Sequence, residues 1–293
     1  MFDEIKPYTR TITVATTYKY IDIKNLFNVL PITPYKVVVK KRGRKKKGTP
    51  IYHNRDVKDG SIITLKFEGS RRGVNLKNKE SKGFFRNALT VYMIIDHAPI
   101  NFKIYYNGKF KITGCKKKEK SVKCMKYFYK HLKKYPKLYE LENENENEDE
   151  ITYVFIHGMR NITFDVGFQI NRQRLDTYIN NNTRYTSLLS PSVGYAGINI
   201  RLPFEHDLSS LEGRKLIRKN GRWSKLKKIV YNDYIEMSKD KSFEKKKRHN
   251  TFLVFHSGNV IMTGLHKDSQ REQFNEFMRV ITECREYIEE KLD

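Results

Sequence analysis

The sequence predicts an α+β fold made of two similar halves, and two observations lead to this prediction. Residues 102–114 (FKIYYNGKFKITG) and 252–264 (FLVFHSGNVIMTG) share an alternating hairpin pattern, a turn glycine and a closing Thr-Gly pair. Around each hairpin the order strand, short helix, strands, hairpin, long helix recurs, which is typical of an internal repeat. We therefore expect one pseudo-two-fold α+β domain.

In the first half, alternation over residues 10–23 predicts a strand that leads into a short helix (DIKNLFNVL). The turn at residues 58–60 (KDG) predicts a hairpin, and residues 87–96 together with the first repeat hairpin add three strands. Residues 117–135 predict an amphipathic helix. Its apolar stripe comprises Val122, Met125, Tyr129 and Leu132.

In the second half, residues 159–170 predict a strand, 171–181 a short helix and 194–202 another strand. Residues 268–292 predict a long amphipathic helix with Asp268 as its N-cap. Its buried stripe comprises Phe274, Phe277, Ile281, Cys284 and Ile288.

The charge balance points to an anionic partner. Lys and Arg total 58 against 33 acidic residues, a net charge of +25, which favours nucleic acid, an acidic protein or an anionic membrane. Residues 36–48 contain eight basic residues and no acidic one, and a second basic segment surrounds Trp223. No apolar run approaches the roughly 18 residues of a membrane span, so we expect no membrane partner.

Composition also suggests boundaries between the halves. We expect a first half at residues 1–139 with a basic insertion at about 35–83, and a second half at 151–293 with a basic insertion at about 203–250. Between them, residues 140–150 (ELENENENEDE) are acidic and of low complexity, which is typical of a solvated linker.

Three separated motifs, in the same order, resemble the TATA-box-binding proteins. Residues 252–277 (FLVFHSGNVIMTGLHKDSQREQFNEF) resemble the family's hairpin and long helix, 159–165 (MRNITFD) its first strand, and 195–202 (YAGINIRL) its FPGLIYRM strand. The resemblance implies a saddle whose curved antiparallel sheet meets the DNA minor groove, with helices on the convex face. The basic insertions and divergence are similar to TBP-like proteins of large DNA viruses.

The second half matches the family's DNA-contacting positions well. The resemblance implies a minor-groove amide at Asn161, kinking aromatics at Tyr195 and Phe255, and a phosphate contact at Arg201. The full set that it implies in this half is Asn161, Thr163, Tyr195, Arg201, Leu253, Phe255, Ile261 and Thr263.

The first half departs further from the family. Ile12 stands where asparagine is expected, Lys103 and Lys111 stand at apolar positions, and Val91 stands at the arginine position. Phe85 is the expected second kinking aromatic, with its neighbour Phe84 as a competing choice. The set implied in this half is Ile12, Val14, Phe85, Lys103, Tyr105, Lys111 and Thr113. We expect these departures to weaken base discrimination and to favour attraction to phosphates. The alternative is that the first half does not enter the groove at all.

The sequence therefore predicts a general transcription initiation factor that binds and bends double-stranded, A·T-rich promoter DNA through the minor groove. Its further expected partners are a transcription factor IIB-like protein and RNA polymerase, in the nucleus or in a viral factory in the host cytoplasm. No residue pattern indicates a catalytic, metal or cofactor site, so we expect no enzyme and no cofactor. Two alternatives stay open: a TBP-fold protein-interaction platform that has lost specific DNA readout, and an accessory domain of an enzyme.

Overall fold

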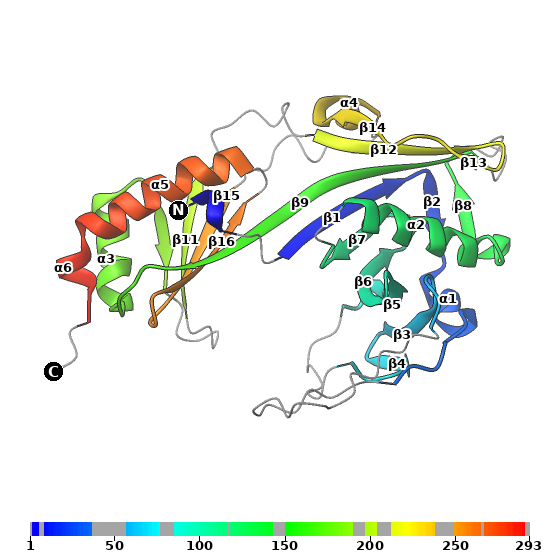
Figure 1. The fold of residues 1–293 in the computed structure, drawn as a ribbon, viewed down its shortest axis with the longest axis horizontal. Coiled ribbons are helices and arrows are strands. Elements are labelled where there is room, and N and C mark those ends of the chain that lie inside the picture. The colour runs from blue at the N-terminus through cyan, green and yellow to red at the C-terminus, as the bar shows by residue number, and fades with distance from the viewer. Residues whose placement is uncertain are drawn as a thin grey trace. The chain divides into compact units, whose positions relative to one another are not determined.

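The computed structural model describes residues 2–5, 9–36, 57–76, 85–115, 118–142, 150–189, 197–203, 212–237, 249–264 and 267–290. The chain divides into two compact units (Figure 1). Unit 1 contains Met1–Thr11, Ile156–Gly213 and Lys228–Asp293, and unit 2 contains Ile12–Phe155 and Arg214–Lys227. Each unit has its own buried apolar cluster, so each is described separately.

Unit 1 is an antiparallel sheet with helices α3 (Arg172–Asn182) and α5 (Lys267–Glu283) packed on one face, as Figure 1 shows. Its strands lie in the order β10 (Thr186–Leu188), β11 (Gly197–Pro203), β15 (His249–Phe255), β16 (Asn259–Gly264) and β9 (Ile151–Asp165). Its helices are the 3-10 turn Phe2–Glu4, α3 (Arg172–Asn182), α4 (Tyr231–Met237), α5 (Lys267–Glu283) and α6 (Arg285–Ile288).

Strand alternation builds the core of unit 1. In β15, Phe252 and Val254 point to the helices, while Leu253 and Phe255 point to the other face, as the alternation predicts. The ring of Phe252 stacks on that of Phe277 of α5, with centroids 4.2 Å apart and planes 8° apart. The helix stripe predicted for residues 268–292 is buried in this cluster, although its last members lie beyond α5.

Unit 2 repeats this construction. Its sheet has the order β1 (Thr9–Thr16), β7 (Phe110–Thr113), β6 (Ala98–Tyr105), β5 (Ala88–Ile95), β3 (Ile62–Phe67) and β4 (Ser70–Gly73). Its helices are α1 (Ile23–Val29), α2 (Lys118–Leu132) and the 3-10 turn Pro136–Leu138, and a small sheet pairs β2 (Tyr18–Ile21) with β8 (Tyr139–Leu141). The remaining strands are β12 (Glu212–Lys219), β13 (Arg222–Trp223) and β14 (Lys227–Val230).

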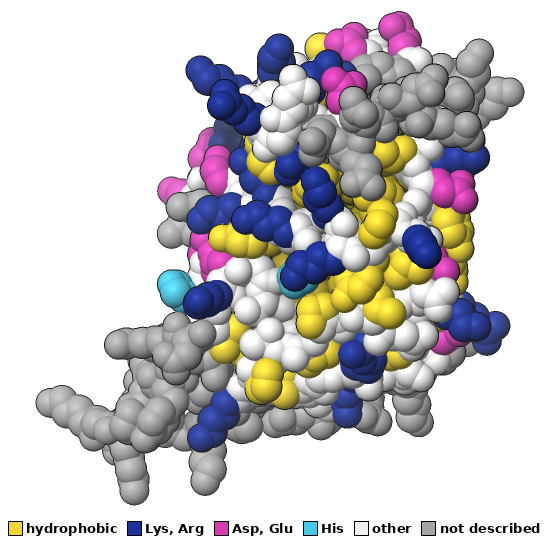
Figure 2. Space-filling model, turned by 90° about the vertical axis from the view of Figure 1, so that its right-hand side faces the viewer, with side chains coloured by type: hydrophobic (Ala, Val, Ile, Leu, Met, Phe, Trp, Pro, Cys, Tyr) yellow, Lys and Arg dark blue, Asp and Glu magenta, His cyan; other side chains and the backbone are white. Residues whose placement is uncertain are grey.

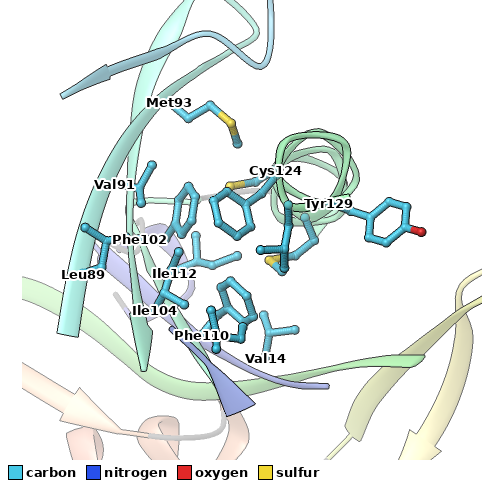
Figure 3. Close-up of a cluster of buried hydrophobic side chains, with 14 of the residues drawn as sticks. Val14, Leu89, Val91, Met93, Phe102, Ile104, Phe110, Ile112, Cys124 and Tyr129 are labelled. Atoms are coloured by element: carbon cyan, nitrogen blue, oxygen red, sulfur yellow. The ribbon is translucent and has the colours of Figure 1, made fainter. Parts of the chain in front are cut away.

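The core of unit 2 lies between its sheet and α2, where the strand side chains converge (Figure 3). Phe102 and Phe110 meet Phe128 of α2 edge-on, with ring centroids 5.3 and 5.7 Å apart. Aromatic edge-to-face contacts of this kind add to the stabilisation that comes from burial.

The two units share one order of elements. In unit 2 it runs β1, α1, β5, β6, β7, α2, and in unit 1 it runs β9, α3, β11, β15, β16, α5. The α+β class with antiparallel pairing, predicted from the repeated hairpin, is confirmed.

Close backbone approaches explain why both hairpins keep a turn glycine. Gly108 has φ +69°, and a Cβ there would lie 2.1 Å from the Tyr18 carbonyl oxygen. Gly258 has φ +83°, and a Cβ there would lie 2.3 Å from the Phe168 carbonyl oxygen. Any other residue at these turns would meet both backbone strain and a steric clash.

One local prediction is wrong: Asp268 lies inside the first turn of α5 because the helix begins one residue earlier, so it is not the N-cap. The turn predicted at residues 58–60 is present, with the Ser61 N–H donating to the Lys58 carbonyl oxygen at 3.1 Å, but most of the strand predicted before it lies outside the described residues. Strand β3 forms its hairpin with β4, through Glu68-Gly69. Most of the linker predicted at 140–150 also lies outside the described residues, and its first residues belong to β8, where Glu140 pairs with Tyr20.

Candidate nucleic-acid interface

The open face of unit 1 is the sheet face opposite α3 and α5. Its residues alternate along each strand with the buried core residues and carry neighbouring side chains across the sheet. Strand pairing sets Asn161 opposite Thr263, Thr163 opposite Ile261, and Ile261 opposite Leu253. We define this face by Asn161, Thr163, Leu188, Asn199, Arg201, Thr251, Leu253, Phe255, Ile261 and Thr263.

The structure thus brings together seven of the eight residues predicted in the second half. The eighth, Tyr195, lies outside the described residues. Phe255 is partly exposed and faces Gly197 across the strand pair, so no side chain on β11 covers that flank of its ring. A partly exposed apolar and aromatic sheet face is typical of a binding surface.

Asn199 is a member of this face that the sequence analysis missed. Its neighbours across the strands are Leu188 and Leu253, both apolar. Its side-chain Oδ1 is buried without a hydrogen-bond partner among the described residues, as is Oδ1 of Asn161. Buried amide oxygens normally find a partner, so both groups indicate that something polar completes this face. The sequence does contain a signal for Asn199. It lies two residues before Arg201 on the same strand, and strand alternation places both side chains on one face.

The open face of unit 2 is defined in the same way, by Thr90, Tyr92, Asn101, Lys103, Tyr105, Lys111 and Thr113. It therefore contains four predicted residues: Lys103, Tyr105, Lys111 and Thr113. Burial raises the pKa of the Tyr92 and Tyr105 phenols, so both keep their hydroxyl proton at neutral pH.

The lysines of this face lie side by side. Lys103 and Lys111 are direct partners across β6 and β7, and Lys103 Nζ lies 4.6 Å from the centroid of the Phe85 ring. Phe85 itself is 59% exposed. Like charges directly opposite each other in a sheet are destabilising, and a bound anion would relieve that repulsion. The predicted Phe85 is thus present beside this face, whereas Phe84 lies outside the described residues.

Ile12 and Val14 do not lie on an open face, which corrects their assignment as groove contacts. They are 1% and 0% exposed in the unit 2 core, because the alternation of β1 directs them toward the helices. Residues 11–13 (TIT) match 161–163 (NIT) in pattern, and Ile12 corresponds to the equally buried Ile162. The motif alignment was one residue out of register.

Val91 does not correspond to Arg201 either, because that assignment is also one residue out of register. Ala88 and Gly197 are equivalent, because each pairs with the hairpin aromatic of its own unit. Tyr92 and Arg201, each four residues further along, are therefore equivalent, and Val91 is a fully buried core residue.

The second basic segment is fixed to unit 2. Arg218 of β12 lies over the Tyr129 ring of α2 at 4.8 Å, and the Trp223 ring lies 5.7 Å from Tyr129 and 5.5 Å from Tyr153. Leu216 joins the buried cluster. The predicted basic run at residues 36–47 lies almost wholly outside the described residues.

The side of the molecule that carries α2, β8 and β13 faces the viewer in Figure 2, with Lys and Arg side chains spread between hydrophobic ones. Among the described residues, no group of His, Cys, Asp and Glu side chains is arranged to hold a metal ion. In the same part of the chain, no helix is both long and apolar enough to cross a bilayer.

Part of the chain is similar to a known family. The family model "Transcription factor TFIID (or TATA-binding protein, TBP)" matches residues 73–135, which run from the end of β4 through α2. This segment of the chain is therefore TBP-like. The match lies in unit 2, whereas the sequence motifs predict the better match in the second half.

Two individual proteins are similar to this TBP-like chain. "Uncharacterized protein 335L" of Invertebrate iridescent virus 6 is 25% identical over 241 residues, which cover 79% of this chain and 70% of the viral protein. The solved structure "Methanococcus jannaschii TBP" is 15% identical, with a TM-score of 0.44, over 95% of this chain and 98% of the archaeal one.

Proposed function

We propose that this TBP-like protein binds double-stranded, A·T-rich promoter DNA through the minor groove and bends it to start transcription. The observation that carries the proposal is the open face of unit 1, where the partly exposed side chains of Leu253, Phe255 and Ile261 share the sheet surface with two amides, Asn161 and Asn199. The minor groove of A·T pairs offers hydrogen-bond acceptors and an apolar floor, and an amide with two N–H donors complements it.

The partner class follows from charge as well. The net charge of +25 and the paired Lys103 and Lys111 fit a polyanion that supplies closely spaced phosphates. In the proposed role, Phe255 enters a base step and opens it, and the helix-covered faces remain available to a transcription factor IIB-like protein and RNA polymerase. Acting in this way, the protein has no catalytic step, and its site of action is the nucleus or a viral factory.

The first test compares three duplexes of equal length by fluorescence anisotropy: A·T-rich, G·C-rich and inosine·cytosine. Inosine lacks the guanine 2-amino group, so an I·C pair presents a minor groove like that of A·T and a major groove like that of G·C. Minor-groove binding predicts tight binding to A·T and I·C duplexes and weak binding to G·C duplexes. End-to-end energy transfer on the same duplexes measures the bend.

A matched pair of variants locates the binding surface. Thr163→Glu places a negative charge on the open face of unit 1, whereas Asn275→Glu places the same charge on an exposed position of α5. We expect Thr163→Glu to weaken DNA binding at least tenfold and Asn275→Glu to leave it within twofold. Equal effects of the two changes, or equal affinity of the wild type for all three duplexes, would favour a protein-interaction platform instead.

A further inference from the structure

Asn101, on β6 of unit 2, is an amide that the family motif does not account for. We propose that Thr113 locks the Asn101 amide with its N–H groups outward, making it a donor-only reader that selects A·T over G·C. This proposal rests on the proposed function, because it assigns base selectivity to the same kind of surface. It also places selectivity in the unit whose motif residues depart from the family.

The geometry is a cross-strand pair. Asn101 and Thr113 are direct partners in the pairing of β6 with β7, on the open face of unit 2. The Thr113 hydroxyl donates to Asn101 Oδ1 at 2.9 Å and lies 3.4 Å from the Asn101 carbonyl oxygen. Both residues are part-buried, so water competes poorly for this bond.

The hydrogen bond to Thr113 determines which amide group of Asn101 is left for a ligand. A primary amide has one oxygen acceptor and one NH2 group with two donors. With Oδ1 held by Thr113, the NH2 group is the part left to face outward. Asn101 is partly exposed on this face, which leaves room for its NH2 group to meet a ligand.

The amides of unit 1 differ in this respect. Oδ1 of Asn161 and Oδ1 of Asn199 have no partner within the described part of the chain, so no hydrogen bond to the oxygen holds either amide in one orientation. Such an amide can rotate to donate to an A·T acceptor or to accept from the 2-amino group of guanine. Of these three asparagines, Asn101 is the one whose oxygen is already engaged.

The chemistry of the groove converts this lock into selectivity. A·T and T·A pairs present acceptors alone in the minor groove, at adenine N3 and thymine O2, whereas a G·C pair adds the guanine N2 donor. An outward NH2 group bonds the acceptors and opposes the guanine amino group, donor against donor. The amide missing at Thr11, the residue that corresponds to Asn161, is therefore supplied from a different strand of the same unit.

The test scans the bound duplex, replacing one A·T pair at a time by G·C and then by I·C. At the pair that meets Asn101, we expect wild-type affinity to fall roughly 5- to 150-fold with G·C, the cost of one unfavourable base pair. The I·C replacement should restore it, because only the 2-amino group is removed. Asn101→Leu should abolish discrimination at that pair alone.

Thr113→Val removes the hydroxyl that holds Asn101 Oδ1 but leaves the Asn101 amide in place, because valine has the shape of threonine without its hydroxyl. We expect the ratio of affinities for the A·T duplex and the duplex with G·C at the Asn101 pair to fall to a few-fold in this variant, whatever its affinity for the A·T duplex itself. The matched control is Thr282→Val, which removes an exposed hydroxyl of α5 that donates to the Met278 carbonyl oxygen and belongs to neither open face. It should leave discrimination at that pair unchanged, and circular dichroism checks that each variant is folded.

Two outcomes overturn the proposal while the proposed function survives. One is full G·C discrimination in Thr113→Val, which would show that the hydroxyl does not orient the amide. The other is an Asn101→Leu profile identical to wild type at every pair. Equal wild-type affinity for A·T-rich and G·C-rich duplexes is a different result, which removes the proposed function itself.

Discussion

Phe252 and Phe255 lie three residues apart on β15 and point to opposite faces of the sheet, so truncating each ring should have a different effect. Phe252 is 1% exposed and stacks on Phe277 of α5. Phe255 is partly exposed and faces a glycine across the strand pair. The fold therefore depends on one ring, and under the proposed function DNA binding depends on the other.

The magnitudes follow from this burial. Phe252→Ala removes a fully buried ring and leaves a cavity, which costs about 3–5 kcal/mol of unfolding free energy. Phe255→Ala removes a ring that is still partly in water, and we expect about 1 kcal/mol or less. On DNA the order reverses, because a stacked base–aromatic contact is worth ~1–3 kcal/mol, or roughly 5- to 150-fold in affinity.

The assay has two arms. Urea unfolding is followed by circular dichroism, because the single tryptophan, Trp223, belongs to unit 2 and does not report directly on this strand. Binding and bending of an A·T-rich duplex are measured by anisotropy and energy transfer. A Phe255→Ala variant as unstable as Phe252→Ala would show that the ring belongs to the core. A stable Phe255→Ala variant with unchanged affinity and bend would refute its insertion into DNA.

Two further predictions concern charge. The double variant Arg222→Ala/Lys225→Ala removes two exposed charges from the second basic segment, and it should lower the slope of log affinity against log salt by about 0.9 for each phosphate that it no longer neutralises. The charge-matched control Lys24→Ala/Lys58→Ala should leave the slope unchanged. Equal slopes for the two double variants would exclude the second basic segment from the interface. Burial lowers the pKa of His131 in the folded chain, so the unfolded chain takes up its proton first and stability should fall as pH drops below about 6.5. His131→Gln should flatten that fall between pH 7 and pH 5 in urea titrations, and an unchanged pH dependence would contradict this assignment.

Strand alternation made much of the unit 1 face predictable. Once residues 252–264 are read as a hairpin, the period of two assigns Leu253, Phe255, Ile261 and Thr263 to a single side. The same rule places Ile12 of β1 in the core, whereas the family motif assigns it to the open face. The two assignments differ by one residue, and a one-residue shift in a strand moves every side chain to the opposite face.

Strand alternation could have placed Asn199 on the open face, but the hydrogen bonding of the Asn101 and Asn199 amides could not be predicted, for a different reason. Whether an asparagine is a reader depends on its partner across the sheet, and strand pairing is a long-range property. The same holds for Trp223, which lies far along the chain from Tyr129 and Tyr153 yet packs against both. Neither arrangement leaves a local periodicity, so each required the structure.

The two open faces share a plan but differ in their chemistry, and this difference has a physical consequence under the proposed function. On the unit 1 face, Leu253, Phe255 and Ile261 lie beside amides, so its affinity comes from apolar burial and hydrogen bonds, which salt screens little. On the unit 2 face, Lys103 and Lys111 draw on counterion release, which salt weakens steeply. A locked amide beside the lysines adds base selectivity, which charge alone cannot give. Phosphates are the same at every base pair, whereas the 2-amino group is present only where the pair contains guanine. Charge and selectivity can then reside in one unit without the asparagine that the family motif places on its first strand.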